Sequence, residues 1–147
     1  MVTLIGMGSG SWEALSVQAQ DAVRRAGLVF GAKRLLAGLP PECTARQFAL
    51  YQPAEILETL AQAPGQDAAV LYSGDTGFYS GASGLLTPLR ALGIPARVYP
   101  GVSSIQLLAA ALGRPWQDWK LVSAHGCACD PVAECMTERS VFFLTGG

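Results

Sequence analysis

The segment Val70–Ala82, with the sequence VLYSGDTGFYSGA, constrains the fold more than any other part of the chain. Its apolar beginning is typical of a buried strand, its small and glycine residues are typical of a tight loop, and the apolar residues that follow recur with helical spacing. In a parallel sheet such a loop lies at the carboxyl end of a strand, where open α/β sheets bind small molecules. The segment therefore predicts an α/β fold with a ligand site at this loop.

Two residue types in the loop are suited to ligand contact. Gly74 and Gly77 have no side chains and would let a ligand approach the backbone closely. Asp75 carries the negative charge of the loop. It could bind a ligand amine or hydroxyl, or cap the loop by accepting hydrogen bonds from backbone amides. The sequence leaves both roles of Asp75 open.

Strand and helix patterns alternate along most of the chain, which predicts a parallel sheet. Ser11 is expected to cap a helix, and Pro88 lies inside a helical pattern, where a kink or a late helix start is expected. The expected strands are residues 2–5, 28–30, 70–72, 96–99, 120–124 and 140–144, with an edge strand within 43–49; the expected helices are 32–37, 104–112 and those that follow Ser11, Pro53, Ala82 and Asp130.

Residues 113–119, GRPWQDW, interrupt this alternation with a proline and two tryptophans. We expect a parallel-sheet N-terminal α/β domain at 1–113, a linker at 114–119 and the beginning of a second α/β domain at 120–147. The elements after residue 120 are too few to form a core of their own, so the second domain is expected to be truncated.

The composition narrows the classes of function. Half of the residues are hydrophobic, 14% are charged and the formal net charge is −1, which gives no basic field for nucleic acid. Apolar runs are too short to span a membrane, and the chain opens on strand-like residues instead of a cleavable signal, which predicts a cytoplasmic protein. The four cysteines are then expected to be reduced thiols.

The turn Gly6–Gly10, GMGSG, follows the first expected strand and resembles a dinucleotide-binding turn. That fingerprint also needs an acidic residue after the second strand, where this chain has Lys33 and Arg34. Those two cations could instead hold the 2′-phosphate of NADP, which keeps an NADP-dependent oxidoreductase as an alternative. A purely structural turn, which lets the helix pack on the sheet, is a third interpretation.

A cluster of His125, Cys127, Cys129 and Cys135 contains groups that bind soft metals. Its C-x-C spacing differs from the usual C-x-x-C knuckle, so free thiols are favoured over a metal site. His125 follows an expected strand at a turn, where it could contact a small ligand, act as a base, or form a structural bond within its loop.

Five segments together resemble the tetrapyrrole methylase family in order and spacing, and the resemblance covers the whole chain. It is closest to the branch that methylates precorrin-6Y or cobalt-precorrin-7. It implies two α/β domains with S-adenosylmethionine bound in the cleft between them, a homodimer, and methyl transfer to carbon 5 of a precorrin or cobalt-precorrin in cobalamin biosynthesis, with a decarboxylating methyltransferase as a partner. The segments are GMGSG at 6–10, YSGDTGFY at 72–79, YPGVSSI at 99–105, SAHG at 123–126 and VFFLTG at 141–146.

The resemblance also implies which residues contact the cofactor and the substrate. Ser9 stands where the family has a proline, and Ser73 where it has a glycine. The implied cofactor-binding residues are Ser9, Ser73, Gly74, Asp75, Phe78, Ser103, Ser104 and Thr145, and the implied substrate-binding residues are Gly8, Gly10, Arg114 and His125. Because the substrate carries many carboxylates, Arg46 and Lys120 are further candidates to line its trough.

These residue types suit methyl transfer. A sulfonium methyl group needs an electron-rich carbon held in line, and positioning supplies most of the acceleration, so neither a strong nucleophile nor a metal is expected. Two alternatives remain at this point: the NADP-dependent oxidoreductase and a non-catalytic ligand-binding module.

Overall fold

A computed structural model describes residues 1–126 and 128–145. The chain forms two compact units, the first being Met1–Ser103 and the second beginning at Ser104. The division falls before the helix at 104–112, which the sequence analysis assigns to the N-terminal domain. In the structure this helix belongs to the second unit, together with the elements that follow it.

A parallel five-stranded sheet forms the centre of the first unit, as predicted. Strand β1 lies inside the sheet and all five of its residues are buried. It pairs with β4 and β5 so that Gly6 lies opposite Tyr72 and Ile5 opposite Tyr99, which brings the carboxyl ends of the three strands together. The strands, in the order β3-β2-β4-β1-β5, are β3 (Arg46–Phe48), β2 (Leu28–Phe30), β4 (Ala68–Tyr72), β1 (Val2–Gly6) and β5 (Ala96–Tyr99).

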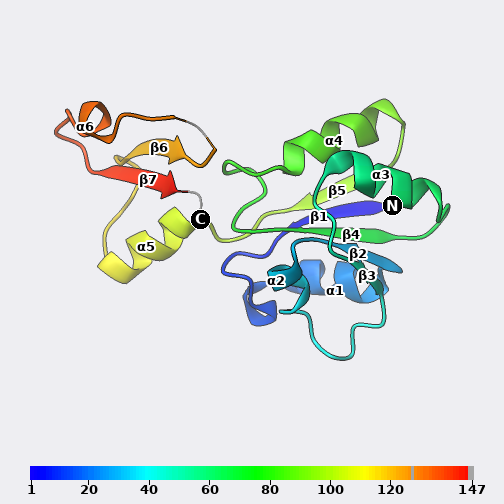
Figure 1. The fold of residues 1–147 in the computed structure, drawn as a ribbon. Helices are drawn as coiled ribbons and strands as arrows, with labels where there is room; N and C mark the ends of the chain where they lie inside the picture. The colour runs from blue at the N-terminus through cyan, green and yellow to red at the C-terminus, as the bar shows by residue number, and fades with distance from the viewer. Residues whose placement is uncertain (127, 146–147) are drawn as a thin grey trace. The chain divides into compact units, whose positions relative to one another are not determined.

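Helices cover both faces of this sheet (Figure 1). Helices α3 (Pro53–Ala61) and α4 (Ala82–Ala91) pack on one face through Ile56, Leu85 and Leu89. On the other face lie α1 (Val17–Arg25) and α2 (Lys33–Leu36), which bury the apolar side chains Ala19, Val23 and Leu35 against the strands. Burial on both faces explains why the inner strands β1, β2 and β4 have nearly continuous apolar sequences, whereas the edge strands β3 and β5 contain exposed residues.

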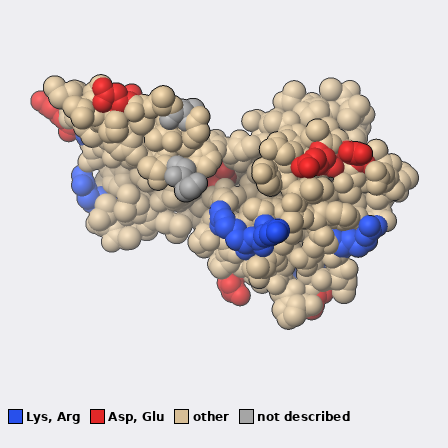
Figure 2. All heavy atoms as spheres, in the orientation of Figure 1, with Lys and Arg blue, Asp and Glu red and all other residues tan. Residues whose placement is uncertain are grey.

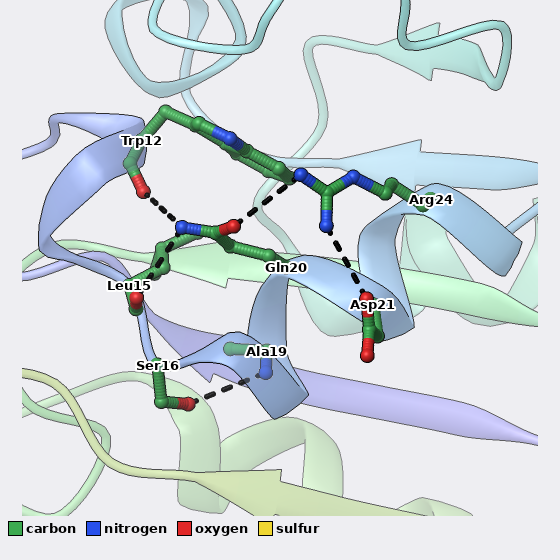
Figure 3. Close-up of polar contacts among 7 residues, drawn as sticks. All are labelled: Trp12, Leu15, Ser16, Ala19, Gln20, Asp21 and Arg24. Carbon is green, nitrogen blue, oxygen red and sulfur yellow. Dashed lines mark hydrogen bonds and ion pairs between the residues drawn. The ribbon is translucent and has the colours of Figure 1, made fainter.

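The prediction that Ser11 caps the first helix is wrong. Ser11 precedes a 3-10 turn, η1 (Trp12–Ala14), and forms no side-chain cap. Helix α1 begins later, where the Ser16 hydroxyl accepts a hydrogen bond from the Ala19 N–H at 3.3 Å. The two segments are then joined by Gln20, whose side-chain amide donates to the carbonyls of Trp12 and Leu15 at 3.2 and 3.4 Å (Figure 3). This local network stops the apolar pattern from forming one continuous helix.

Pro88 lies inside α4, which already begins at Ala82, so the late helix start is wrong. The Ala82 N–H donates to the Ser80 hydroxyl at 3.2 Å at the beginning of the helix. Packing of Leu85 and Leu89 in the core outweighs the hydrogen bond that a proline removes from a helix.

The second unit contains a pair of parallel strands, β6 (Lys120–Ala124) and β7 (Val141–Thr145), in register from Lys120 opposite Val141 to Ala124 opposite Thr145. Helix α5 (Ser104–Leu112) precedes them and buries Ile105 and Ala109. The short helix α6 (Pro131–Glu134) is capped as predicted, because the Asp130 carboxylate accepts from two backbone N–H groups. The helices within the described residues are too short, or too polar, for any of them to span a membrane.

Candidate functional site

The carboxyl ends of β1, β4 and β5 meet at three glycines. A Cβ atom built on Gly101 would lie 2.2 Å from the Gly74 carbonyl oxygen and 2.5 Å from that of Gly6. A Cβ atom on Gly6 would likewise lie 2.6 Å from both the Gly101 nitrogen and the Gly74 oxygen. Only glycine fits at Gly6 and Gly101, because the three backbones are in direct contact. We call the edge formed by residues 8–10, 73–78 and 101–103 the carboxyl edge.

The loop after β1 is hydrogen-bonded to the loop after β4. Gly8 and Gly74 exchange two backbone hydrogen bonds of 3.0 and 2.9 Å and form an isolated antiparallel bridge. Their φ angles are +58° and +64°, in the left-handed region that favours glycine. Ser9 follows at the tip and is exposed. The predicted contact residues Gly8, Ser9 and Gly74 are thus brought together.

Asp75 caps the loop after β4 and ties it to the loop after β5. Its Oδ2 atom accepts from the Gly77 N–H at 2.9 Å, and its Oδ1 atom accepts from the Gly101 N–H at 3.1 Å. The neighbouring Thr76 hydroxyl donates to the Tyr99 carbonyl at 3.4 Å. Of the two roles that the sequence leaves open, the structure displays the capping role, whereas ligand binding by Asp75 stays a prediction.

Ser73 has a partner that sequence reasoning did not predict. The Arg34 guanidinium, from α2, donates a hydrogen bond to the Ser73 hydroxyl. A Cβ atom on Gly10 would lie 3.7 Å from the Nη1 atom of Arg34, so this arginine touches the loops after both β1 and β4. Figure 2 shows Lys and Arg side chains grouped over α2, the helix that contains Lys33 and Arg34.

Two aromatic side chains end the loop after β4. The rings of Phe78 and Tyr79 are 4.9 Å apart and meet edge to face at 71°. Tyr79 is 52% exposed and adopts a φ of +48°, which is uncommon for a residue with a side chain. At the start of the loop, burial raises the pKa of Tyr72 from 10.0 to about 12, because a partly buried phenolate loses hydration.

Ser103 completes the carboxyl edge. It is buried, and its Cα lies 3.9 Å from the position of a Cβ built on Gly74. The structure therefore brings together seven predicted site residues of the first unit, with Phe78 in the same loop: Gly8, Ser9, Gly10, Ser73, Gly74, Asp75 and Ser103.

The other four predicted site residues belong to the second unit. Ser104 opens α5 and is exposed. The exposed His125 directly follows β6 and Thr145 ends β7, so in this parallel pair they lie at the same end of the two strands. Arg114 donates to the Ser140 hydroxyl at 3.2 Å, and its guanidinium carbon lies 6.0 Å from the centre of the Trp119 ring.

Two of the basic residues suggested for the substrate trough have other surroundings. Lys120 forms an ion pair of 2.7 Å with Glu134 and also donates to the Glu134 carbonyl. Arg46 begins β3, at the amino end of a strand, with its guanidinium carbon 5.3 Å from the centre of the Phe48 ring. Arg46 therefore lies away from the carboxyl edge, and Arg34 lies at it.

The predicted cysteine cluster is only partly visible, because Cys127 lies outside the described residues. Cys43, Cys129 and Cys135 are free thiols. Within 1–126 and 128–145, no three His, Cys, Asp or Glu side chains gather in a way that could hold a metal ion.

Comparison with known proteins identifies the family. A family model described as Tetrapyrrole (Corrin/Porphyrin) Methylases matches residues 1–143. The chain belongs to the tetrapyrrole methylase family. This methylase chain is 32% identical over 147 residues to the cobalt-precorrin-7 C(5)-methyltransferase of Salmonella typhimurium, covering 99% of the chain and 71% of that protein. It is also 32% identical over 120 residues to the precorrin-4 C(11)-methyltransferase of Rhodococcus erythropolis, covering 77% of the chain and 48% of the relative.

The crystal structure of the methyltransferase CobJ has a similar fold, with a TM-score of 0.72 and 25% sequence identity. The match covers 89% of this methylase chain and 57% of CobJ, so the chain spans only part of the length of that relative. These findings confirm the predicted α/β class and the family resemblance that the five sequence motifs indicated.

Three residues at or beside the carboxyl edge are absent from the predicted contact residues: Gly6 and Gly101, which the sequence analysis names only within motifs, and Arg34, which it considers only for the 2′-phosphate of NADP. A signal for the two glycines exists, because each stands at or just after the end of an expected strand, where backbones converge. For Arg34 no local pattern could reveal the contact, since it joins residues that are 39 positions apart.

Proposed function

We propose that this chain is an S-adenosylmethionine-dependent C-methyltransferase that acts on carbon 5 of a precorrin or cobalt-precorrin macrocycle in cobalamin biosynthesis. Membership of the methylase family supports methyl transfer. The choice of carbon 5 follows the Salmonella relative, which matches 99% of the chain, over the C(11)-methyltransferase, which matches 77%. The structural observation that carries the proposal is the convergence of seven predicted contact residues at one sheet edge.

The groups at the carboxyl edge suit S-adenosylmethionine. Ser9 is exposed and offers a hydroxyl, and the neighbouring peptide groups offer donors and acceptors for the ribose and the amino-acid part. Phe78 and Tyr79 offer aromatic surface beside the same loop, which suits an adenine ring. Bound here, the cofactor would supply an electrophilic methyl group.

The protein's own contribution to the reaction would be orientation. Asp75 ties the loop after β4 to the loop after β5, and Gly8 ties it to the loop after β1, so the edge is held from both sides. A rigid edge keeps the two reactants in one relative geometry, which is the main requirement for transfer from an already activated methyl donor. His125 and Thr145 are proposed to add contacts from the second unit.

The dinucleotide alternative is disfavoured by the position of α1. In the dinucleotide fingerprint the glycine turn opens directly into a helix, whose N-terminus binds the pyrophosphate. Here η1 follows the turn, and α1 begins only at Val17. The glycines at 8 and 10 are thus not followed by a helix N-terminus.

Isothermal titration of the whole chain with S-adenosylhomocysteine and with NADP tests the cofactor. We expect saturable binding of S-adenosylhomocysteine and none of NADP. Phe78→Ala is expected to weaken that binding about tenfold or more, because an aromatic contact with the ligand contributes on the order of 1.5–3 kcal/mol. Val17→Ala, an exposed position on α1, is the matched control and should leave binding unchanged. Binding of NADP alone would overturn the cofactor assignment, and binding of neither would favour a non-catalytic module.

Assays of methyl transfer by the whole chain to cobalt-precorrin-7 and to precorrin-4 test which ring carbon is methylated. We expect methyl label to appear on cobalt-precorrin-7, at carbon 5 by NMR. Label on precorrin-4 alone would reassign the reaction.

We further propose that the protein acts as a cytoplasmic homodimer beside a separate decarboxylating methyltransferase. Light scattering of the purified chain, which measures its mass in solution, tests the dimer.

A further inference from the structure

The geometry points to Arg34 as a residue that binds a carboxylate at the carboxyl edge, with Ser73 holding its guanidinium in place. The inference rests on the proposed function, because that function brings carboxylates to this edge. It gives Arg34, which the sequence analysis considers only for the 2′-phosphate of NADP, a role in the proposed methyl transfer. The carboxylate belongs either to a side chain of the tetrapyrrole or to the amino-acid part of the cofactor.

Arg34 is carried on a firmly packed segment. Its neighbour Leu35 is 2% exposed and belongs to the core cluster on the α1 and α2 face of the sheet. Leu35 also lies against the loop after β1, since a Cβ on Gly10 would be 3.6 Å from its Cδ2 atom. At the end of the same segment, a Cβ on Gly38 would lie 2.5 Å from the Gly10 carbonyl oxygen. The backbone around Arg34 is therefore fixed relative to the predicted contact residues.

Among the residues that the structure describes, no ion pair neutralises the charge of Arg34. Its partner Ser73 offers a neutral hydroxyl, which orients the guanidinium without compensating its charge. The ion pairs among the described residues are Met1 with Asp67, Arg24 with Asp21 and Lys120 with Glu134, and Arg34 is in none of them. A guanidinium has five N–H donors, so the bond to Ser73 leaves enough of them for a bidentate carboxylate.

The position of Arg34 distinguishes it from the other arginines considered for the substrate. Arg46 lies at the amino end of β3, over the Phe48 ring. Arg34 instead contacts Ser73 directly after β4 and lies beside Gly10 after β1. A ligand that rests on both of these loops would come within reach of its guanidinium. Because arginine matches carboxylate geometry with two parallel hydrogen bonds, Arg34 would also fix the ligand's orientation.

Binding measurements on the whole chain with three probes test the inference. Uroporphyrin III is a tetrapyrrole rich in carboxylates, S-adenosylhomocysteine has one carboxylate, and 5′-methylthioadenosine keeps the adenosine but has none. We expect Arg34→Gln to weaken binding of uroporphyrin III or of S-adenosylhomocysteine about tenfold or more, and to leave 5′-methylthioadenosine unchanged within about twofold. Whichever of the two carboxylate probes is affected identifies the source of the carboxylate.

Two further variants and a control separate recognition from structure. Arg34→Lys keeps the charge but loses the planar fork, so it should recover only part of the affinity. Ser73→Ala removes the orienting hydroxyl and should give a smaller loss for the same probe. Arg25→Gln is the matched control, because Arg25 is an exposed arginine at the end of α1 that lines a shallow surface pocket with Met1 and Asp67, away from the carboxyl edge.

The outcomes distinguish this inference from the proposed function. If wild type binds the probes and Arg34→Gln binds all three as wild type does, the role of Arg34 is wrong and the function stands. Equal weakening of all three probes would mean that Arg34 only supports the fold of the loops, which also overturns its role. A wild-type chain that binds none of the probes would overturn both the function and the inference.

Discussion

The two glycine-rich loops of the first unit are alike in sequence but differ in what surrounds their backbones. The loop after β1 is packed from outside: a Cβ on Gly8 would lie 3.5 Å from the Val102 backbone, and the Gly10 carbonyl is covered by Gly38. The loop after β4 depends on one of its own side chains, since the Asp75 carboxylate accepts from the Gly77 N–H inside the loop and from the Gly101 N–H after β5. A Cβ on Gly77 would meet only this carboxylate. The shape of the first loop is therefore set by the backbones around it, and that of the second by the Asp75 side chain.

The largest effect is expected at the glycine junction beneath both loops. Gly101→Ala would place a Cβ atom 2.2 Å from the Gly74 carbonyl oxygen, and neither backbone can move without separating β1, β4 and β5. We expect a loss of more than about 3 kcal/mol in the free energy of unfolding, measured by urea denaturation.

Gly81→Ala is the control for this substitution. Gly81 has a φ of −69°, and a Cβ there would lie 3.8 Å from the Tyr72 ring, an ordinary contact. Its stability should change by less than about 0.5 kcal/mol. Equal stability of the two variants would contradict the tight junction described at the carboxyl edge.

A smaller loss of stability is expected at Asp75, which fixes the shape of the loop after β4. Asp75→Ala removes two acceptors and leaves the N–H groups of Gly77 and Gly101 without them. We expect a loss of about 1–3 kcal/mol by denaturation, together with weaker binding of S-adenosylhomocysteine, because the loop would lose its fixed shape.

Asp75→Asn sharpens the same comparison, because it keeps one side-chain oxygen acceptor and should recover about half of the lost stability. If Asp75→Ala keeps the wild-type stability but no longer binds S-adenosylhomocysteine, Asp75 contacts the ligand directly and its capping bonds are secondary. If Asp75→Ala keeps both the wild-type stability and the binding of S-adenosylhomocysteine, the shape of the loop after β4 does not depend on Asp75.

The smallest effect is expected at Tyr72, where β4 enters its loop. Burial raises the pKa of its phenol from 10.0 to about 12. Between about pH 10 and pH 12 the unfolded chain therefore releases this proton while the folded chain keeps it. The resulting contribution to stability is present below pH 10 and is lost as the pH rises towards 12. Tyr72→Phe lacks this ionisation, so its stability should fall less than that of wild type over the same range, as measured by urea denaturation. Parallel pH curves for the two proteins would contradict the burial of the phenol.

Most of the first unit could be predicted from local patterns. Apolar runs ending at glycine or small residues marked β1, β2 and β4, because a strand covered on both faces has a nearly continuous apolar sequence. The sequence wrongly predicts that Ser11 caps the first helix, and the reason lies in a side chain that apolar periodicity ignores. The Gln20 amide bonds the carbonyls of Trp12 and Leu15, and this side-chain contact, which apolar periodicity does not record, ends the turn before α1 begins.

The position of the candidate site along the chain could be predicted from the sequence, but the hydrogen bonds between its loops could not. The sequence indicated a ligand loop at 73–78, and the structure places Gly8, Ser103 and the β5 end beside it. It could not indicate that Asp75 bonds Gly101, which is 26 positions away, or that Arg34 reaches Ser73. The sequence also suggests Arg46 as a substrate residue, because it shows a cation but not the end of the sheet at which that cation lies.

The order of strands and helices, the class of fold and the loops in which small residues gather follow from local sequence, because periodicity and backbone freedom depend on neighbouring residues. Which of those loops touch depends on how the distant strands pair. The contacts among Gly6, Gly74 and Gly101, and between Arg34 and Ser73, join distant parts of the chain. They exist because parallel pairing of β1 with β4 and β5 brings three strand ends to one edge, where α2 packs against the loop after β1.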